Sequence, residues 1–271
     1  MNRRQKTILI MLLAALLLAG AVVSGLTLGD ERVVTNLDAR NASPSLEHPF
    51  GTDHLGRDML GRTLKGLTVS IGVGIIAAAA STAIALAMGM LAATMGKAAD
   101  AAISWLIDLF LGVPHLVALI LISFTLGGGM KGVVVGIALT HWPSLARIIR
   151  AEVMQLRSAE YVQVSRRLGK SRWWIASRHI LPHLAPQLFI GFVLLFPHAI
   201  LHEAAISFLG FGLSPHQPAI GIILSESMRY LTSGMWWLAF FPGISLLVIV
   251  RAFDTLGENL RLLTDPRSAR Q

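Results

Sequence analysis

The sequence predicts an all-α membrane protein, a polytopic bundle of six transmembrane helices with a helical hairpin at its cytoplasmic face. Apolar residues make up 54% of the chain and charged residues only 14%, against roughly 25% charged residues in a soluble domain. The mean hydropathy is +0.64. A soluble fold of 271 residues would need more polar surface than this. The bilayer is therefore the simpler solvent for the chain.

Six apolar stretches are long enough to cross a bilayer, at about 20 residues per helix. They cover residues 7–28, 69–95, 101–126, 133–149, 187–208 and 235–253. The first follows a basic start and contains Ala19-Gly20-Ala21, a weak cleavage-like site. Its apolar run exceeds the 7–15 residues of a signal-peptide core, which favours an uncleaved helix. The second is rich in Gly and Ala, which allows close helix packing and predicts a central position in the bundle.

The net charge of +8 has two interpretations, nucleic-acid binding or an accumulation of Lys and Arg in cytoplasmic loops. With a cytoplasmic N-terminus, 16 of the 23 basic residues lie in inside segments: Arg3, Arg4, Lys6, Lys97, Arg147, Arg150, Arg157, Arg166, Arg167, Lys170, Arg172, Arg178, Arg251, Arg261, Arg267 and Arg270. The other 7 lie in outside segments: Arg32, Arg40, Arg57, Arg62, Lys65, Lys131 and Arg229. This asymmetry predicts six spans with both termini in the cytoplasm and argues against nucleic acid as a partner.

Three regions follow from this topology. Residues 1–68 form an N-terminal transmembrane helix and an external loop, residues 69–257 the main transmembrane domain, and residues 258–271 a cytoplasmic tail. The chain has no cysteine, which excludes disulfides and thiolate metal sites.

The polar segment between the fourth and fifth spans is too long for a simple connector. Residues 151–168 have helical periodicity, and Gly169 fits the left-handed position that ends a helix. Ser171 is placed to cap a second helix, and Pro182 and Pro186 are expected to break the chain before the fifth span. A hairpin of this kind suits docking to a partner. The alternative is an amphipathic hairpin that lies on the membrane surface without one.

The hairpin sequence Glu-Tyr-Val-Gln-Val-Ser-Arg-Arg-Leu-Gly, residues 160–169, with Leu181-Pro182 after it, resembles the "EAA" loop of binding-protein-dependent ABC permeases. The sequence departs from the family's Glu-Ala-Ala triplet at residues 163–165 and from its isoleucine at His179. The resemblance implies a coupling hairpin that contacts ATPase subunits through five residues: Glu160, Tyr161, Ser165, Leu168 and Gly169.

Three further segments resemble the dipeptide, oligopeptide and nickel permeases of that family. They are Gly-Thr-Asp-His-Leu-Gly-Arg-Asp (51–58), Ser-Phe-Leu-Gly-Phe-Gly-Leu (207–213), and Leu260-Arg261 with Asp265-Pro266-Arg267. Taken alone, the first of these reads as an Asx and glycine turn before a helix. The resemblance implies a prokaryotic inner-membrane subunit that works by alternating access with a second permease, two ABC ATPase subunits and an external solute-binding protein, which would approach from the side of Asp53 and Arg229.

The chain is not expected to bind or hydrolyse ATP itself. Gly169-Lys170-Ser171 looks like the end of a phosphate-binding loop, but the first glycine of that motif would fall at Val164. No cofactor is therefore expected on this chain, and the resemblance likewise implies that ATP and Mg²⁺ are used by separate subunits.

The fifth span carries ionisable residues, which are costly at membrane depth and usually face a cavity. His198 and His202 share a helix face, and Glu203 follows. An intramembrane zinc protease would need His-Glu-x-x-His, and Ala199 stands at the Glu position, which disfavours that enzyme. We therefore expect His198, His202 and Glu203 on a translocation pathway, with the two histidines as candidate metal ligands. Hydrogen bonding between helices is the alternative role.

Nickel or another transition metal, free or chelated, is the cargo that the sequence favours, and a short peptide is the alternative. The histidine pair before Ser207 and the His141-Trp142 pair look more like the nickel permeases. A Glu four or five residues before that Ser would be expected of the peptide permeases, and Glu203 fits this too. His115, beside Pro114, is expected to be a structural hydrogen-bonding residue, and His54 and His216 indicate no role.

Overall fold

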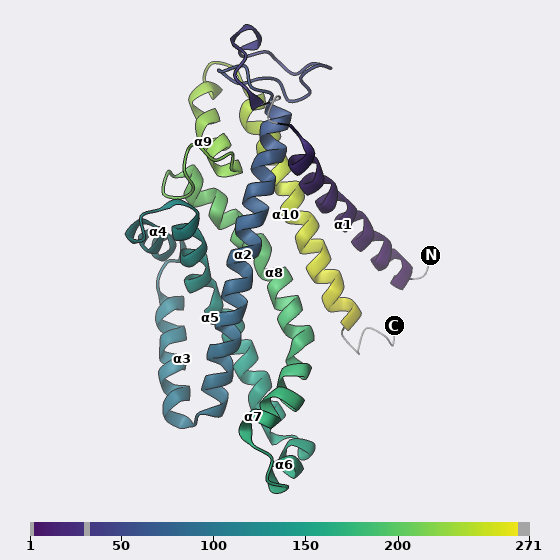
Figure 1. The fold of residues 1–271 in the computed structure, drawn as a ribbon, viewed down its shortest axis with the longest axis vertical. Coiled ribbons are helices and arrows are strands. Elements are labelled where there is room, and N and C mark those ends of the chain that lie inside the picture. Colours follow the sequence, from purple (N-terminus) through teal and green to yellow (C-terminus); the bar gives the residue numbers. More distant parts are fainter. Residues whose placement is uncertain (1–2, 30–32, 265–271) are drawn as a thin grey trace.

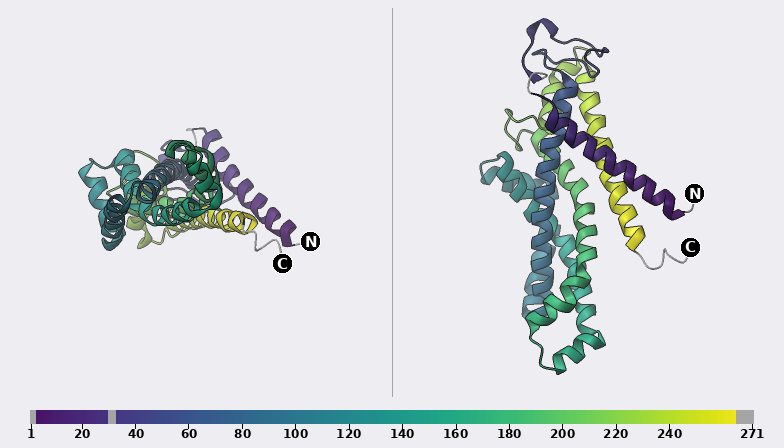
Figure 2. Two further views of the ribbon diagram at one scale, coloured as in Figure 1. Left: turned by 90° about the horizontal axis from the view of Figure 1, so that it is seen from below. Right: turned by 45° about the vertical axis from the view of Figure 1, so that its right-hand side comes forward.

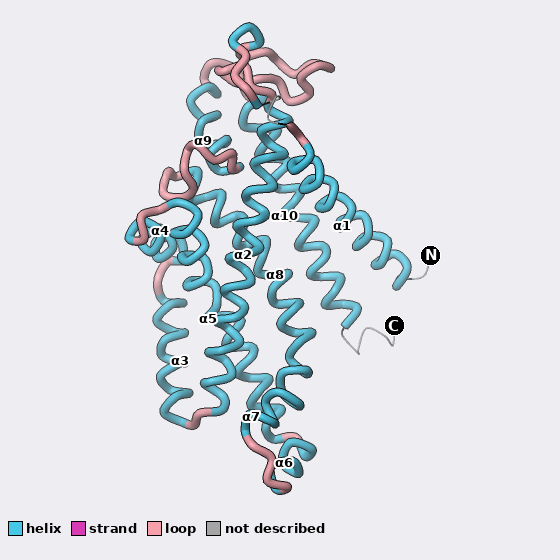
Figure 3. The backbone as a smooth tube through the Cα atoms, viewed as in Figure 1, coloured by secondary structure: helices cyan, strands magenta, loops and turns pink. Residues whose placement is uncertain are grey.

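The chain folds into a long helical bundle (Figure 1). The structure is a computed structural model that describes residues 3–29 and 33–264. Figure 3 shows helices joined by loops, and the described ranges contain no β-strand. The helices are α1 (Arg3–Thr27), η2 (Leu37–Ala39), α2 (Met59–Thr94), α3 (Lys97–Gly112), α4 (His115–Thr125), α5 (Gly129–Ser158), α6 (Glu160–Arg167), α7 (Arg172–Ile175), the π-helix η3 (Ala176–Ile180), α8 (Leu181–Phe208), α9 (Ile220–Leu231) and α10 (Trp237–Thr264). The predicted all-α fold is confirmed.

The predicted third span differs from the structure, which divides it into α3 and α4. Five continuous helices are long and apolar enough to cross a membrane, and α3 with α4 gives a sixth span only as a pair bent by 98°. The bend lies at Val113-Pro114, where Val113 adopts an extended conformation. A proline disfavours the helical conformation of the residue before it and has no N–H to donate. An apolar stretch of the right length therefore contains an elbow.

Helix α2 occupies the centre of the bundle, as its small residues predicted. It contacts α1, α3, α5, α8, α9 and α10 (Figure 1). A Cβ atom added at Gly89 would meet Ile149 of α5 at 2.9 Å, and one added at Gly74 would meet Phe196 of α8 at 3.0 Å. The helix begins ten residues before the predicted span, since the Asp58 carboxylate caps it by accepting the Gly61 N–H at 2.8 Å.

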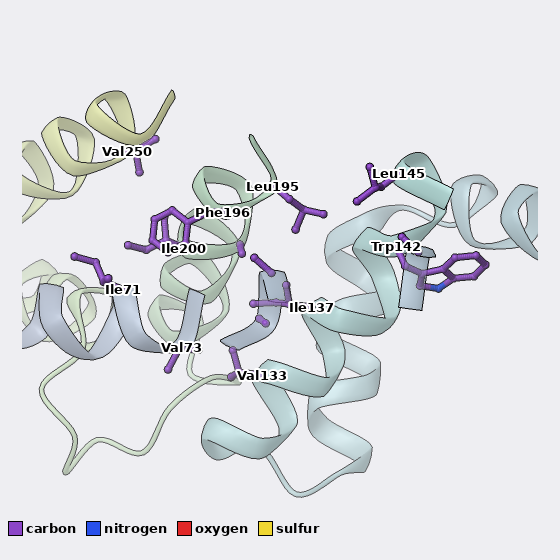
Figure 4. Close-up of a cluster of buried hydrophobic side chains, with 14 of the residues drawn as sticks. Ile71, Val73, Val133, Ile137, Trp142, Leu145, Leu195, Phe196, Ile200 and Val250 are labelled. Atoms are coloured by element: carbon purple, nitrogen blue, oxygen red, sulfur yellow. The ribbon is translucent and has the colours of Figure 1, made fainter. Parts of the chain in front are cut away.

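The core lies where α2, α5, α8 and α10 meet (Figure 4). These apolar side chains from elements far apart in the sequence hold the long helices in register. Those drawn and labelled are Ile71, Val73, Val133, Ile137, Trp142, Leu145, Leu195, Phe196, Ile200 and Val250. Helix α1 lies obliquely across this bundle and packs mainly against α2 and α10 (Figure 2).

The predicted hairpin is present but its first helix is divided. Helix α5 ends at Ser158, Ala159 is extended, and α6 starts anew, so residues 151–168 do not form one helix. Gly169 has φ +75°, which confirms the predicted left-handed position. The Ser171 hydroxyl accepts the Trp174 N–H at 3.1 Å, which confirms the predicted cap. Figure 1 shows α6 at the extreme end of the molecule.

The expectation that Pro182 and Pro186 break the chain is wrong. The helix runs on from α7 through η3 into α8, and residues 172–208 form one continuous helix. Pro182 stands at the start of α8, directly after the π-helical turn, where the Leu181 N–H bonds to the Ala176 carbonyl five residues earlier. The wider turn satisfies the backbone around a residue that has no N–H of its own.

Pro242 shows how the bundle uses a backbone carbonyl that a proline leaves free. Pro242 inside α10 cannot donate to the Leu238 carbonyl. The Ser227 hydroxyl of α9 donates to that carbonyl at 2.8 Å, which ties α9 to α10.

Of the residues considered in the sequence, Arg32, Arg267, Arg270 and the segment Asp265-Pro266-Arg267 lie outside the described residues.

Candidate functional site

A cavity of about 720 Å³ lies along one side of the bundle, against the α3–α4 elbow, α5 and α8. Its wall mixes apolar side chains with an unusual number of polar ones. The lining residues are Leu111, His115, Thr140, His141, Ser144, Leu145, Ile148, Glu152, Gln187, Ile190, Gly191, Leu194, Leu195, His198, His202 and Arg261.

The polar lining residues form one stripe on each of two membrane-spanning helices. On α5 the stripe comprises His141, Ser144 and Glu152, which are spaced by whole helical turns. On α8, Gln187 and His198 are spaced in the same way. Polar side chains at membrane depth usually line water-filled space, since hydrocarbon cannot hydrogen-bond to them. The two stripes therefore mark the cavity as a polar path along the bundle.

The structure places the three predicted pathway residues on different sides of α8. His198 is exposed and His202 half-buried, and both line the cavity. Glu203 is fully buried and is not among the lining residues. Its carboxylate accepts the Ser207 hydroxyl at 2.8 Å, and Ser207 in turn accepts the Leu213 N–H at 3.1 Å. Glu203 thus holds the loop formed by residues 207–213 against α8.

His202 lies beside two histidines from other elements, His115 at the start of α4 and His141 in α5. The ring centroids are 4.2 Å apart for His115 and His141, 4.5 Å for His115 and His202, and 5.0 Å for His141 and His202. One ring nitrogen from each lies within 4.8 Å of the other two, and all three rings are half-buried. We call these residues the histidine cluster. His198, predicted as the partner of His202, is not a member of it.

The sequence alone did not identify His115 as part of this group. It was expected to be a structural hydrogen-bonding residue, but its buried Nδ1 has no hydrogen-bond partner among the described residues. The elbow at Pro114 turns α4 so that His115 meets α5 and α8. Glu152, Ser144 and Gln187 were also missed. The signal that could have found them is the spacing of polar residues on one face of an otherwise apolar helix.

The hairpin exposes several of the predicted coupling residues at the end of the molecule. Leu168 is 73% exposed and Tyr161 47% exposed, and Glu160 and Gly169 are exposed as well. Ser165 is half-buried, and its hydroxyl lies 3.0 Å from Nε2 of His179. Exposed apolar side chains at the tip of a hairpin are typical of a surface that binds a partner.

A second cavity, of about 430 Å³, lies between the base of the hairpin and the end of α2. Its wall is mostly apolar, with Trp173 and Ile175 from α7 and Met90 from α2. Arg157 spans the junction by donating to the Ala93 carbonyl at the end of α2. The end of α5, directly before the hairpin, is thereby bonded to the central helix.

The opposite end of the bundle carries the α1–α2 loop (residues 33–58), which a buried ion-pair network fixes. Asp53 is 2% exposed, and its carboxylate lies 2.7 Å from both the Arg57 and the Arg62 guanidinium groups. Arg62 continues to Glu226 of α9 at 2.7 Å. Burial alone would raise the pKa of Asp53. Arg62 and the hydrogen bonds and charge of Arg57 outweigh burial and hold the pKa below its usual value.

This network gives the segment formed by residues 51–58 a structural role. Gly56 has φ +73°, and a Cβ there would overlap the Asn36 carbonyl. The Asp53 carboxylate accepts the Leu55 and Arg57 N–H groups at 2.9 Å each, an Asx-type turn as expected. The segment therefore joins the α1–α2 loop, α2 and α9 into one unit.

Comparison with known proteins gives a family match. The family described as "Binding-protein-dependent transport system inner membrane component" matches residues 85–264. The dipeptide transport system permease protein of Bacillus subtilis (strain 168) is 33% identical over 235 residues, 87% of this chain and 73% of that protein. A putative peptide transport system permease protein of Brucella suis biovar 1 is 34% identical over 267 residues, 98% of this chain and 89% of that protein.

Solved structures show the same fold. The inward-facing MetNI methionine ABC transporter matches with a TM-score of 0.59 at 17% identity, over 76% of this chain and 98% of that chain. An amino acid ABC transporter matches with a TM-score of 0.57 at 18% identity, over 78% of this chain and 95% of that chain. At these identities the likeness concerns the fold alone.

Proposed function

This chain belongs to the family of inner-membrane components of binding-protein-dependent transport systems and is the permease subunit of an ABC importer; from that premise we propose that it forms half of a pathway for short peptides. It is not itself an enzyme, since ATP hydrolysis in these importers belongs to separate ATPase subunits. The relatives carry the choice of cargo, because those at 33–38% identity are named as dipeptide or peptide permeases.

The shape and chemistry of the cavity agree with a peptide. Its volume of about 720 Å³ falls within the 300–1,000 Å³ range that small-molecule sites occupy. Glu152 and Arg261 supply opposite charges on its wall, and Gln187 supplies an amide donor and acceptor. A peptide carries a terminal ammonium, a carboxylate and amides that match these groups. Nickel, the cargo favoured from the sequence, has no counterpart in the names of these relatives.

We propose that a second permease covers the open side of the cavity. The polar stripes of α5 and α8 would otherwise face lipid, where unpaired polar groups are costly. An external solute-binding protein would deliver cargo to the end that carries the α1–α2 loop and the exposed Arg229. In this arrangement both termini lie in the cytoplasm, and the pathway opens alternately to either side.

Two ABC ATPase subunits, which would hold the ATP and Mg²⁺, are the proposed partners of the α6–α7 hairpin. The hairpin offers exposed apolar side chains at its tip, and Arg157 at the end of α5, directly before the hairpin, donates a hydrogen bond to α2. Movement of an ATPase would therefore be transmitted to the central helix. No cofactor site on this chain is needed for the proposed function.

The test of the docking site is Leu168→Glu. A charge at this exposed position should leave the bundle intact and reduce co-purification of the ATPase subunits at least tenfold, because the carboxylate would be desolvated in the interface. Leu46→Glu, the same change at an exposed position in the α1–α2 loop, is the matched control. Equal ATPase recovery with both variants would show that the hairpin tip is not the docking site.

The test of the cargo is uptake by the complete transporter in proteoliposomes. Radiolabelled dipeptide and radiolabelled Ni²⁺ are supplied side by side with the solute-binding protein, and uptake is normalised to assembled complex. ATP-dependent dipeptide uptake is the expected result. Uptake of Ni²⁺ without uptake of dipeptide would overturn the peptide proposal and favour metal as the cargo.

The double variant His198→Gln/His202→Gln is measured in the same assay. Glutamine keeps polarity and hydrogen bonding, so packing should survive. If the two histidines line the pathway, cargo uptake per complex should fall severalfold. His216→Gln, which alters a histidine outside the cavity, is the matched control. Unchanged uptake in the double variant would show that the histidines are not required for transport.

A further inference from the structure

We infer that His115, His141 and His202 form a binding site for a divalent transition-metal ion of borderline softness, such as Zn²⁺ or Ni²⁺. The three side chains come from three elements, α4, α5 and α8, and meet where the α3–α4 elbow closes on the bundle. This inference goes beyond the transport function and does not depend on the cargo, since it concerns an ion held by this chain.

The first step in the argument is distance. One ring nitrogen of each histidine lies within 4.8 Å of those of the other two. Around a tetrahedral Zn²⁺ with bonds of about 2.1 Å, ligand nitrogens lie roughly 3.4 Å apart. Small side-chain rotations of the three half-buried rings cover the difference. Three imidazoles around one point are the ligand set of open zinc sites and also suit nickel.

The second step is the protonation pattern of two of the rings. Nδ1 of His141 lies 3.0 Å from the Ile137 carbonyl, and Nδ1 of His202 lies 2.7 Å from the His198 carbonyl. A carbonyl oxygen only accepts, so in both rings Nδ1 carries the proton and donates it. Nε2 is then left with a lone pair. An Nδ1–H donated to a backbone carbonyl is the usual arrangement that orients a metal-binding histidine.

The third step is the set of buried nitrogens without a partner. Within the described residues, Nε2 of His141 and Nδ1 of His115 are buried and have no hydrogen-bond partner. Leaving a buried polar atom without a hydrogen-bond partner is unfavourable. Two such atoms in one cluster call for a common explanation, and a bound cation would satisfy both.

The fourth step is access. All three histidines line the 720 Å³ cavity, so an ion and its remaining water ligands can reach the site. Three protein ligands leave a tetrahedral ion one open position, which would face the cavity. Because the ligands lie on α4, α5 and α8, a bound ion would fix the elbow to both stripe-bearing helices.

The experiment measures binding of Zn²⁺ and Ni²⁺ by isothermal titration calorimetry. It uses the full-length chain with its co-expressed transporter subunits in lipid nanodiscs. The expected result is one ion per chain and, by mass action, a rise in the thermal unfolding midpoint with ion concentration. His115→Gln, His141→Gln and His202→Gln should each weaken binding at least tenfold.

His198→Gln is the matched control, because His198 lies in the same cavity one turn from His202 but outside the cluster. It should leave affinity and stoichiometry unchanged. Binding that survives in the triple variant, or that falls as much with His198→Gln as with the three cluster variants, would overturn the proposed site. So would a wild type that binds neither ion.

Substitution at His141 could disturb folding, since part of its ring is buried. Absorption of Co²⁺ in the wild type gives a measurement that needs no variant, because intense visible bands of Co²⁺ report tetrahedral coordination by the protein. Their appearance at one equivalent, and their loss on competition with Zn²⁺, is expected. Only the weak spectrum of hydrated octahedral Co²⁺ would contradict the site.

Discussion

Asp53 shows how a single side chain organises one end of this permease. Its carboxylate accepts backbone N–H groups inside its own turn and faces two guanidinium groups. Through Arg62 the interaction reaches Glu226 in α9, 164 residues further along the chain. A buried charge is tolerated only when it is paired and hydrogen-bonded, and here every contact needed for that comes from one short segment and two helices.

Asp53→Asn should destabilise the folded protein by about 3 kcal/mol, because it leaves two guanidinium groups facing a neutral side chain in a buried site. The measurement is the free energy of unfolding in detergent. Asp108→Asn is the matched control, since Asp108 pairs with Arg147 where both side chains are more than half exposed. An exposed pair contributes about 0–1 kcal/mol. Equal losses in the two variants would contradict a special role for Asp53.

The stabilisation by Asp53 should also depend on pH. Folding lowers the pKa of this carboxyl, so its contribution is fully present above the unfolded value of about 3.9 and is lost as pH falls through the folded value. The difference in unfolding midpoint between wild type and Asp53→Asn should therefore be constant near neutral pH and shrink in acid. A difference that does not shrink as the pH falls progressively below about 3.9 would contradict this reasoning.

At the scale of elements, the α6–α7 hairpin depends on one backbone position. Gly169 has φ +75°, and a Cβ added there would meet no atom within 4 Å. The requirement for glycine is therefore conformational and not one of space, since β-branched residues are strongly disfavoured at positive φ. The angle between α6 and α7 follows from this turn.

Gly169→Val should leave the protein inserted and assembled but uncouple transport, because the turn between α6 and α7 would distort. The measurement is substrate-stimulated ATP hydrolysis by the reconstituted transporter. Gly169→Asn is the matched control, because asparagine adopts the left-handed conformation far more readily than valine. Wild-type coupling in Gly169→Val would show that the hairpin does not relay the motion of the ATPases.

At the scale of the whole molecule, the ends of the bundle differ in charge. The end with the α6–α7 hairpin carries Arg157, Arg166 and Arg172, whereas the other end carries the ion-paired α1–α2 loop. Figure 1 shows that α1 starts and α10 ends on the side away from that loop. Because Lys and Arg concentrate in cytoplasmic segments, we expect the hairpin end to face the cytoplasm.

Reporter fusions test this orientation. Fusions after Gln5 and at the C-terminus should both report a cytoplasmic location, and a fusion within the α1–α2 loop should report the opposite side. The expectation follows from the basic asymmetry of 16 to 7 and from an even number of crossings, with α3 and α4 counted as one span. A C-terminus outside the cytoplasm would mean that the bent pair does not cross the membrane.

The sequence by itself determined the helical class, the approximate positions of five of the six predicted spans and the glycine turn at Gly169. These features depend on local composition and on backbone conformations that only certain residues adopt. It also located the Ser171 cap, because capping requires a specific side chain at a fixed spacing. The peptide-permease relatives agree with the family that the hairpin motif indicated, while the preference for nickel was drawn from histidines whose surroundings were unknown.

Only the tertiary structure decided which histidines meet. His198 and His202 are four residues apart and share a face, yet the rings that meet His202 belong to His115 and His141, from other helices. Tertiary structure likewise decided the effect of two prolines: the chain bends at Pro114, whereas the helix continues through Pro182. A proline breaks a helix only where the surrounding backbone groups cannot form their hydrogen bonds in another way. Contacts between distant segments depend on helix packing, which local sequence does not specify.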